Sequence, residues 1–278
     1  MAPTILITGA SQGIGKATAL LFARNGYDLV LAARQVDRLE TVAQEITGLG
    51  YNAPLTVGCD VRDAGQVNNL VQKALERYSN IDVLVNNAGI FATGTVEDFS
   101  LEDWHQIIDT NLWGYIHTIH ALLPHFLARG SGTIVNLSSI GGKVPTPYVT
   151  AYCTSKFAVT GLTESLQAEL KPKGIQVCGI YPSLIRSSLM ERAIFRGKDA
   201  EDEKNRREQL GSVTNVPAVE KPTDVANAIW DAVKNQKSEV LVGSANLAQG
   251  MYRLFPGLTQ WASRQTLKNQ DEVKGSRK

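Results

Sequence analysis

Two side chains spaced four positions apart could carry out proton transfer. Tyr152 and Lys156 lie in a stretch of helical period, so they project from one face of the predicted helix, a single turn apart. A phenol has a pKa of about 10 in water, and a neighbouring ammonium favours the phenolate. The pair could therefore donate and accept a proton. Because the same spacing is also typical of exposed surface pairs, the rest of the chain has to supply the context.

A glycine-rich segment after the first apolar run could hold a phosphate. The residues Thr8-Gly9-Ala10-Ser11-Gln12-Gly13-Ile14-Gly15 stand where a predicted strand ends and a helix begins. Glycines let the backbone approach a pyrophosphate, whose charge the free N–H groups and dipole of the helix N-terminus stabilise. The spacing differs from the common G-x-G-x-x-G fingerprint, and a tight turn without a ligand is the alternative. The turn predicts dinucleotide contacts from Gly9, Ser11, Gln12, Gly13, Ile14 and Gly15.

The residue after the second apolar run bears on the choice of nucleotide. A site for NAD usually has an acidic side chain there for the ribose 2′-hydroxyl, whereas this chain has Arg34 after two alanines. A guanidinium suits a 2′-phosphate, and Arg38 follows one helical turn later. We therefore expect NADP(H), with a place on a solvated helix face as the alternative for Arg34. After the third run, Asp60 with Val61 could contact the adenine, or Asp60 could cap the next helix.

The hydrophobic pattern supplies the elements that would bring these segments together. Short apolar, β-branched runs alternate with stretches of helical period, which is typical of a parallel sheet covered by helices on both faces. We predict strands over 4–8, 28–32, 53–60, 81–86, 132–138, 176–181 and 239–242. We predict helices over 13–25, 36–49, 67–78, 101–129, 150–170 and 222–235. The predicted fold class is α/β, a Rossmann-type doubly wound fold with a seven-stranded parallel sheet.

The length of the chain suits one domain of this kind with an added segment. At 278 residues, we predict a single catalytic domain over 1–245 and a C-terminal appendix over 246–278, whose end is polar and expected to be flexible. The segment 187–210 is rich in charge, and we expect it to form a mobile excursion over the site.

The bulk composition indicates a small-molecule partner. The net charge is +1 and no Lys/Arg block tracks phosphates, so we expect no nucleic acid. Three cysteines without disulfide or metal spacing, and no signal-peptide pattern, favour the cytoplasm. No apolar run is long enough to span a membrane. We expect no metal, because one helical region without ligand spacing contains His105, His117, His120 and His125.

Further motifs accompany the glycine turn in a fixed order. They are Asn86-Asn87-Ala88-Gly89, Asn136-Leu137-Ser138-Ser139 and the segment from Tyr152 to Lys156. Together the motifs resemble the short-chain dehydrogenase/reductase superfamily in its compact single-domain branch, and the resemblance spans roughly residues 4–242. It implies an oxidoreductase that transfers a hydride between a nicotinamide and a carbonyl or alcohol substrate.

The resemblance also implies a role for each catalytic candidate. Tyr152 would act as general acid and base at the substrate oxygen. Lys156 would lower the pKa of Tyr152 and bond the nicotinamide ribose. Ser139 would hold the substrate oxygen, with Ser138 as the less favoured alternative, and Asn111 would support a water leading from Lys156 to solvent. Donors aimed at the oxygen where negative charge develops would stabilise the transition state.

Two more segments resemble cofactor-contacting turns of this family. The first closes the fourth strand, could equally serve as a structural loop, and comprises Asn87, Ala88 and Gly89. The second follows the sixth strand, and its nicotinamide-side candidates are Pro182, Ile185 and Ser187. Ser183 departs from the glycine of the family, and because a serine adopts positive φ less readily, the local backbone could differ.

The loops after the strands would contact the substrate. Their apolar side chains favour an apolar or bulky carbonyl compound and are Ile90, Phe91, Val144, Tyr148, Leu189, Met190 and Phe195. The apolar, aromatic appendix could cover the site, pack on its own core or on another subunit, or make peripheral contact with a lipid surface. The resemblance implies a homodimer or homotetramer formed through the helices at 101–129 and 150–170.

Two other functions are compatible with this fold. One is a 3-oxoacyl-thioester reductase of the same superfamily, and the other is a non-catalytic NADP(H)-binding sensor or scaffold. A sensor need not retain the catalytic candidates, and this chain has Asn111, Ser139, Tyr152 and Lys156. The sequence therefore favours an enzyme.

Overall fold

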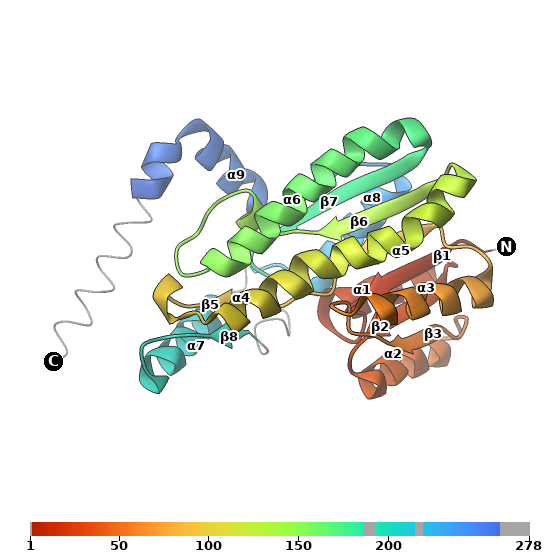
Figure 1. Cartoon of the computed structure of the whole chain (residues 1–278), viewed down its shortest axis with the longest axis horizontal. Coiled ribbons are helices and arrows are strands. Elements are labelled where there is room, and N and C mark those ends of the chain that lie inside the picture. The colour runs from red at the N-terminus through yellow and green to blue at the C-terminus, as the bar shows by residue number, and fades with distance from the viewer. Residues whose placement is uncertain (1, 186–192, 215–218, 262–278) are drawn as a thin grey trace.

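A parallel sheet forms the centre of the computed structural model, which describes residues 2–185, 193–214 and 219–261. Within these ranges, seven parallel strands form one sheet in the order β3-β2-β1-β4-β6-β7-β9 (Figure 1). The strands are β1 (Thr4–Thr8), β2 (Asp28–Ala33), β3 (Leu55–Gly58), β4 (Val83–Asn86), β6 (Gly132–Leu137), β7 (Ile175–Pro182) and β9 (Glu239–Val242). The predicted seven-stranded Rossmann-type sheet is confirmed.

Helices cover both faces of the sheet because strand residues alternate between two apolar cores. In β1, Ile5 and Ile7 belong to the core beneath α1, α2 and α8, whereas Leu6 belongs to the core beneath α3, α5 and α6. Figure 1 shows α5 and α6 in front of the sheet and α8 behind it. The bounds are α1 (Gly13–Arg24), α2 (Val36–Gly48), α3 (Ala64–Tyr78), α5 (Gly114–Arg129), α6 (Thr150–Leu170) and α8 (Pro222–Lys234). Short 3-10 helices are η1 (Val96–Asp98), η3 (Ile140–Gly142) and η4 (Lys171–Lys173).

The helix predicted over 101–129 is divided in the structure. The helix α4 (Leu101–Ile108) passes into a π-helical turn, Asp109–Trp113, and α5 begins at Gly114. The hydrophobic pattern continues through this turn, so the sequence does not reveal it. A widened turn inside a helix is frequently found at a functional site, and here it holds the fully buried Asn111.

The expected excursion at 187–210 forms regular elements where it is described. The strand β8 (Ile194–Phe195) pairs in parallel with β5 (Ala92–Thr93), and α7 (Ala200–Thr214) follows. Asp103 on α4 accepts two hydrogen bonds from the guanidinium of Arg196, at 2.6 and 2.8 Å. A bidentate ion pair of this kind fixes orientation as well as distance, so it holds β8 beside the end of the sheet. Residues 186–192 lie outside the described residues.

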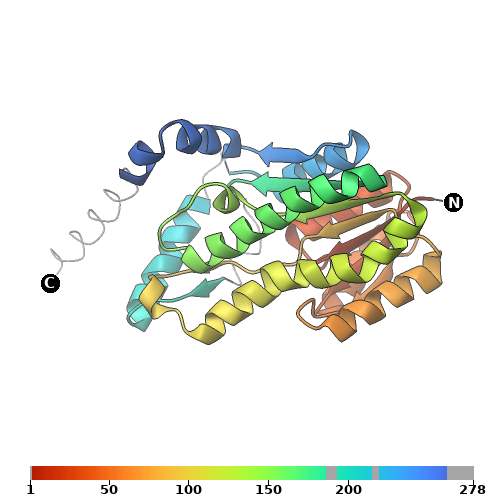
Figure 2. The ribbon, with the colours of Figure 1, turned by 45° about the horizontal axis from the view of Figure 1, so that its top comes forward.

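The C-terminal helix α9 (Ala245–Leu254) leaves β9 and stands out from the sheet, at the end of the molecule opposite to the N-terminus (Figures 1 and 2). Two of its residues, Ala245 and Gln249, are buried. Across the part of the chain that the structure describes, no helix is both long and apolar enough to cross a membrane.

Candidate active site

The loops that follow the strands enclose a cavity of about 460 Å³ at the carboxyl edge of the sheet. Its wall contains the turns after β1, β2, β3, β4, β6 and β7, together with residues of α4 and α6. The strand order reverses between β1 and β4, and in open α/β sheets ligands bind at the carboxyl ends of the strands beside such a reversal. The cavity therefore collects residues that are far apart in the sequence.

Most of the predicted nucleotide-contacting residues lie in the wall of this cavity. Gly15 does not, because it is buried beneath the glycine turn, and Ser187 lies outside the described residues. The residues in the wall are Gly9, Ser11, Gln12, Gly13, Ile14, Arg34, Asp60, Val61, Asn87, Ala88, Gly89, Tyr152, Lys156, Pro182 and Ile185.

Backbone geometry explains the glycines of the turn after β1. Gly9 has φ +66° and Gly13 has φ +55°, in the left-handed region that glycine tolerates best. A Cβ atom at Gly15 would lie 2.3 Å from the carbonyl oxygen of Gly9. The first turn of α1 can therefore pack directly against the loop only when residue 15 has no side chain.

Asn87 supports the glycine turn from the neighbouring strand β4. Its side-chain amide donates to the carbonyl oxygens of Thr8 (2.9 Å) and Gly9 (3.1 Å). The hydroxyl oxygen of Thr8 in turn accepts from the backbone N–H groups of Asn87 (3.0 Å) and Ala88 (3.1 Å). These bonds support the structural alternative for this segment. Thr8 is a positioning residue that the sequence-based prediction lacks, although its place directly before Gly9 is a usable signal.

Charged side chains surround the part of the wall formed by β2 and β3. Asp60 forms an ion pair with Arg62 at 2.6 Å, and hydrogen bonds from Arg62, assisted by the charge of Arg34, lower the pKa of the Asp60 carboxyl group. The helix α3 is capped instead by Asp63, whose carboxylate accepts from two backbone N–H groups of the first turn. The alternative that Asp60 caps this helix is therefore wrong.

Ser183, where the family resemblance implies a glycine, does not need the positive φ that glycine tolerates. Among the described non-glycine residues, positive φ occurs at Ser79, Tyr148 and Gln236, but not at Ser183. The Ser183 hydroxyl donates to the carboxylate of Glu220 at 2.7 Å. The serine hydroxyl thus links the end of β7 to the residue two positions before α8.

Three of the four catalytic candidates meet in the cavity. Tyr152 and Lys156 stand on α6, and the Lys156 Nζ atom lies 5.8 Å from the centre of the Tyr152 ring. Ser139 follows β6, and its hydroxyl acts to lower the pKa of Tyr152. All three line the cavity, whereas Asn111 does not.

Burial dominates the acidity of the tyrosine and lysine. It raises the pKa of Tyr152 to about 12, although the hydrogen bond with Ser139 acts in the opposite direction. It lowers the pKa of Lys156 to about 7. The expected lowering of the Tyr152 pKa by Lys156 is not found, because burial penalises both the phenolate and the ammonium. The phenol of Tyr152 is thus protonated at neutral pH.

Asn111 makes three hydrogen bonds, two with the backbone of Ile90 and one with the side chain of Ser155. Its side-chain amide donates to the carbonyl oxygen of Ile90 and to the hydroxyl of Ser155, both at 3.0 Å, and its oxygen accepts from the Ile90 N–H group at 2.8 Å. Lys156 donates to the carbonyl oxygen of Leu137 at 2.8 Å. Asn111 therefore links the loop after β4 to α6, and a water between Asn111 and Lys156 stays a prediction.

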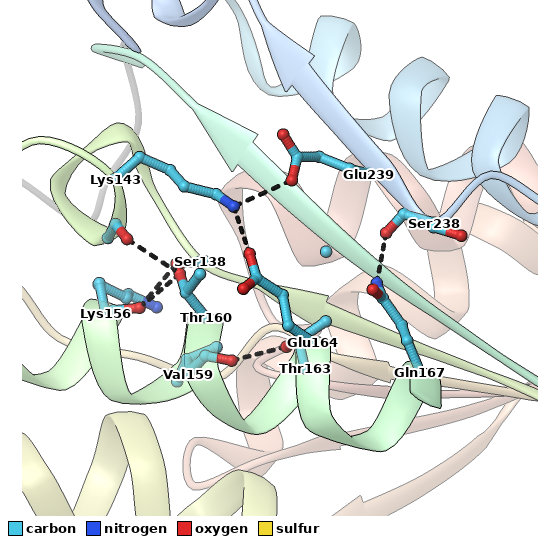
Figure 3. Close-up of polar contacts among 12 residues, drawn as sticks. Ser138, Lys143, Lys156, Val159, Thr160, Thr163, Glu164, Gln167, Ser238 and Glu239 are labelled. Atoms are coloured by element: carbon cyan, nitrogen blue, oxygen red, sulfur yellow. Dashed lines mark hydrogen bonds and ion pairs between the residues drawn. The ribbon is translucent and has the colours of Figure 1, made fainter. Parts of the chain in front are cut away.

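Ser138 fastens the end of β6 to α6. Its hydroxyl donates to the carbonyl oxygen of Lys156 at 3.0 Å and lies 3.1 Å from the hydroxyl of Thr160 (Figure 3). Ser139, by contrast, acts on Tyr152, because its hydroxyl lowers the pKa of that phenol. This difference favours Ser139 over Ser138 as the residue that faces the reacting groups.

Lys143 anchors the loop that begins at Ser139. Its ammonium donates to Glu164 on α6 at 2.6 Å and to Glu239 on β9 at 2.9 Å (Figure 3), and it lies 4.4 Å from the centre of the Tyr181 ring. Burial acts to lower the pKa of Lys143, but the hydrogen bonds to the two glutamates outweigh it and raise that pKa. The loop is thereby tied to both α6 and β9.

The side of the cavity around Tyr152 is mainly apolar. Ile90 and Phe91, which the sequence predicts, line it, and the Phe91 ring lies edge-on to the Tyr152 ring with 4.8 Å between centroids. Phe195 packs in the same cluster but is not part of the wall. Two other predicted residues lie away from the wall, Val144 and Tyr148. Two more lie outside the described residues, Leu189 and Met190.

The sequence does not single out several residues of this wall. Ile194 and Leu210 come from β8 and α7, in a segment without a motif. Gln106 and Thr110 lie one helical turn apart in the stretch that holds Asn111. That spacing is a sequence signal for Gln106 and Thr110. Ile194, by contrast, is brought beside Ala92 by the pairing of β8 with β5, which no local pattern predicts.

Comparison with known proteins identifies the relatives of this fold. A family model described as short chain dehydrogenase matches residues 3–198. The chain belongs to this family. Oxidoreductase UcpA of Salmonella typhimurium is 37% identical to this short-chain dehydrogenase over 248 residues, which cover 89% of this chain and 93% of the relative. The predicted superfamily and enzyme class, a short-chain dehydrogenase/reductase, are thereby confirmed.

Solved structures of the family superpose on most of this short-chain dehydrogenase. A short-chain dehydrogenase/reductase from Burkholderia phymatum in complex with NAD has a TM-score of 0.82 at 27% identity, and the match covers 89% of this chain and 91% of that one. An alcohol dehydrogenase from the archaeon Thermococcus sibiricus complexed with 5-hydroxy-NADP has a TM-score of 0.73 at 30% identity, with 87% and 96% covered.

Proposed function

We propose that this short-chain dehydrogenase uses NADP(H) to interconvert an apolar carbonyl compound and its alcohol, with Tyr152 as general acid and base. The observation that carries the proposal is that Tyr152, Lys156 and Ser139 line one cavity together with the glycine turn. Two similar solved structures hold NAD and 5-hydroxy-NADP, which supports a nicotinamide nucleotide as the partner of this cavity.

The cavity wall fits such a nucleotide. The turn at Gly9 and Gly13 presents backbone at the N-terminus of α1, where the helix dipole favours phosphate. The wall at 33–35 contains the guanidinium of Arg34 and no carboxylate. A guanidinium pairs well with a 2′-phosphate, and Arg38 lies close enough to donate a hydrogen bond to Gln12 of the turn. These features favour NADP(H) over NAD(H).

The residues of the chain would control the proton. A bound reduced nicotinamide would supply the hydride. Tyr152 would donate its proton to the substrate oxygen during reduction, since burial keeps the phenol protonated. Ser139 would bond the same oxygen, where negative charge develops. Lys156, with a pKa of about 7, would exchange protons near neutrality and restore the phenol.

The apolar wall supports an apolar substrate. Phe91, Val149 and Leu210 line the side of the cavity next to Tyr152. A charged substrate would lose its hydration on this side, where the described wall residues are apolar and offer no opposite charge. That loss costs about several kcal/mol. We therefore expect aliphatic and aromatic ketones or aldehydes to be better substrates than charged ones.

The first experiment follows the absorbance of NADPH and NADH with a panel of ketones, aldehydes and 3-oxoacyl thioesters. We expect turnover with NADPH, and Tyr152→Phe should lower kcat by about 10²- to 10⁴-fold. Tyr51→Phe, which removes a hydroxyl from a residue packed against the core beneath α2, is the matched control and should keep wild-type activity. Equal activity of Tyr152→Phe and wild type would exclude the proposed role of Tyr152.

A second experiment tests the nucleotide. Arg34→Asp should shift the preference from NADPH towards NADH by about tenfold or more, because a carboxylate repels the 2′-phosphate and can bond a 2′-hydroxyl. Arg24→Asp, at the last turn of α1, is the control and should leave the preference unchanged. NADPH binding without turnover of any substrate would instead favour the sensor function.

A further inference from the structure

The C-terminal segment presents an apolar face outside the catalytic fold. The helix α9 and the helical residues 256–261 after it carry large apolar side chains that are 40% to 74% exposed. Within α9 they recur at spacings of four and three residues and so form a stripe along one side of that helix, and further exposed apolar side chains follow it at Phe255, Leu258 and Trp261. The stripe consists of Leu247, Met251, Leu254, Phe255, Leu258 and Trp261. A contiguous exposed apolar surface of this kind marks an interaction site.

The position of the segment leaves this stripe accessible. Figures 1 and 2 both show α9 standing out from the sheet at the carboxyl end of the strands. Its inner side packs on β9 and η3, and the buried residues of α9 are Ala245 and Gln249. No described residue therefore covers the stripe, which is exposed to solvent in that part of the chain.

The charge of the same part of the sequence indicates which surface. No aspartate or glutamate occurs between Glu239 and Asp271, whereas Arg253, Arg264 and Lys268 do. Residues 245–278 contain six basic and two acidic residues, a net charge of +4, and the remainder of the chain carries −3. Leucine, phenylalanine and tryptophan on one side, with basic and few acidic residues, are typical of helices that lie on anionic lipid.

Pairing of the stripe with a second copy fits this charge less well. In a twofold interface the same patch meets itself. Residues 245–261 contain Arg253 and no acidic residue, so a self-complementary interface would offer that basic side chain no partner of opposite charge, and like charges at an interface are unfavourable. An anionic lipid surface complements this charge.

We propose that the face formed by residues 247–261 docks this enzyme on an anionic lipid surface, with α9 lying in the plane of the interface. Because α9 packs on η3, the turn directly after Ser139, docking would hold the active-site cavity near the lipid. The inference concerns binding to the surface and stands whether or not the proposed reaction is correct.

Co-sedimentation of the full chain with vesicles tests this proposal. We expect binding to vesicles that contain phosphatidylglycerol, weaker binding to pure phosphatidylcholine, and a loss of binding as the salt concentration rises. Leu254→Glu, at a side chain that is 74% exposed, should weaken binding about tenfold or more. Leu101→Glu, at a 79% exposed side chain on α4, is the matched control and should bind as wild type.

Three outcomes would overturn the proposal. The first is a failure of the wild type to bind anionic vesicles, and the second is equal loss of binding in the Leu254→Glu and Leu101→Glu variants. The third is a change of assembly mass in Leu254→Glu, measured by sedimentation velocity, with unchanged vesicle binding, which would assign the stripe to a second copy. Circular dichroism of each variant shows that it is folded, and NADPH binding, measured separately, keeps a failure here distinct from a failure of the proposed reaction.

Discussion

Lys156 allows the effect of burial on the catalytic pair to be measured as stability. Burial lowers its pKa from 10.5 to about 7 in the folded chain. Between these values the unfolded chain binds more protons than the folded chain, so stability must rise as the pH increases through this range. At about 1.4 kcal/mol for each pKa unit, burying Lys156 costs about 4 kcal/mol at pH 7 and about 2 kcal/mol at pH 9.

The variant Lys156→Met should abolish this pH dependence. From pH 7 to pH 9 the free energy of unfolding of the wild type should rise by about 2 kcal/mol relative to the variant, or about 4–8 °C in Tm for a chain of this size. The comparison stops at pH 9 because burial raises the pKa values of Cys59 and Cys178. Above the ordinary thiol pKa the unfolded chain loses these protons while the folded chain keeps them. The free energy of unfolding therefore falls there for a reason unrelated to Lys156.

Lys143→Met is the matched control, since Lys143 is also a lysine with a largely covered side chain. Its pKa is raised, so its ion pairs contribute stability that is fully present below pH 10.5 and is lost only above it. Removing it should lower stability by the same amount at pH 7 and pH 9. Urea unfolding followed by tryptophan fluorescence, without nucleotide, measures all three proteins. If wild type and Lys156→Met change in parallel between the two pH values, Lys156 is not desolvated and the reasoning is wrong.

Three further substitutions test how the site is positioned. Asp103→Asn should weaken the hold on Arg196 and loosen β8, raising the KM for the carbonyl substrate more than it lowers kcat; an unchanged KM at saturating NADPH would count against this role. Gly15→Ala should raise the Kd for NADPH about tenfold or more, as measured by fluorescence titration, because its Cβ would meet the carbonyl oxygen of Gly9 at 2.3 Å. Asp63→Ala should lower the free energy of unfolding by about 1 kcal/mol with kcat unchanged, since it removes only the cap of α3.

Much of the fold follows from local pattern. The strand predicted at 4–8 matches β1 residue for residue, and the helix predicted at 150–170 matches α6. Both depend on local patterns of apolar residues. A strand that is covered on both faces shows a continuous apolar run, and a helix shows apolar residues at a period of 3.6. The π-helical turn at 109–113 does not follow, because its residues continue the helical pattern and only the width of the turn changes.

The site divides in the same way. The glycine turn and the spacing of Tyr152 and Lys156 can be recognised without coordinates, because each depends on residues within a single turn or helix. The pairing of β5 with β8, and the ion pair of Asp103 with Arg196, join segments far apart in the sequence. No local pattern encodes such a contact.

The sequence by itself determined how the main strands and helices alternate along the chain, where the glycine turn lies, and which residue types could move a proton. Tertiary structure alone decided which of those residues share a cavity, that Asn111 bonds Ile90 and Ser155, and that the Tyr152 pKa rises instead of falling. The reason is physical. Propensity and period act over a few neighbouring residues, whereas burial depends on every segment that packs around a group, and it is burial that sets the free energy of a charge at this site.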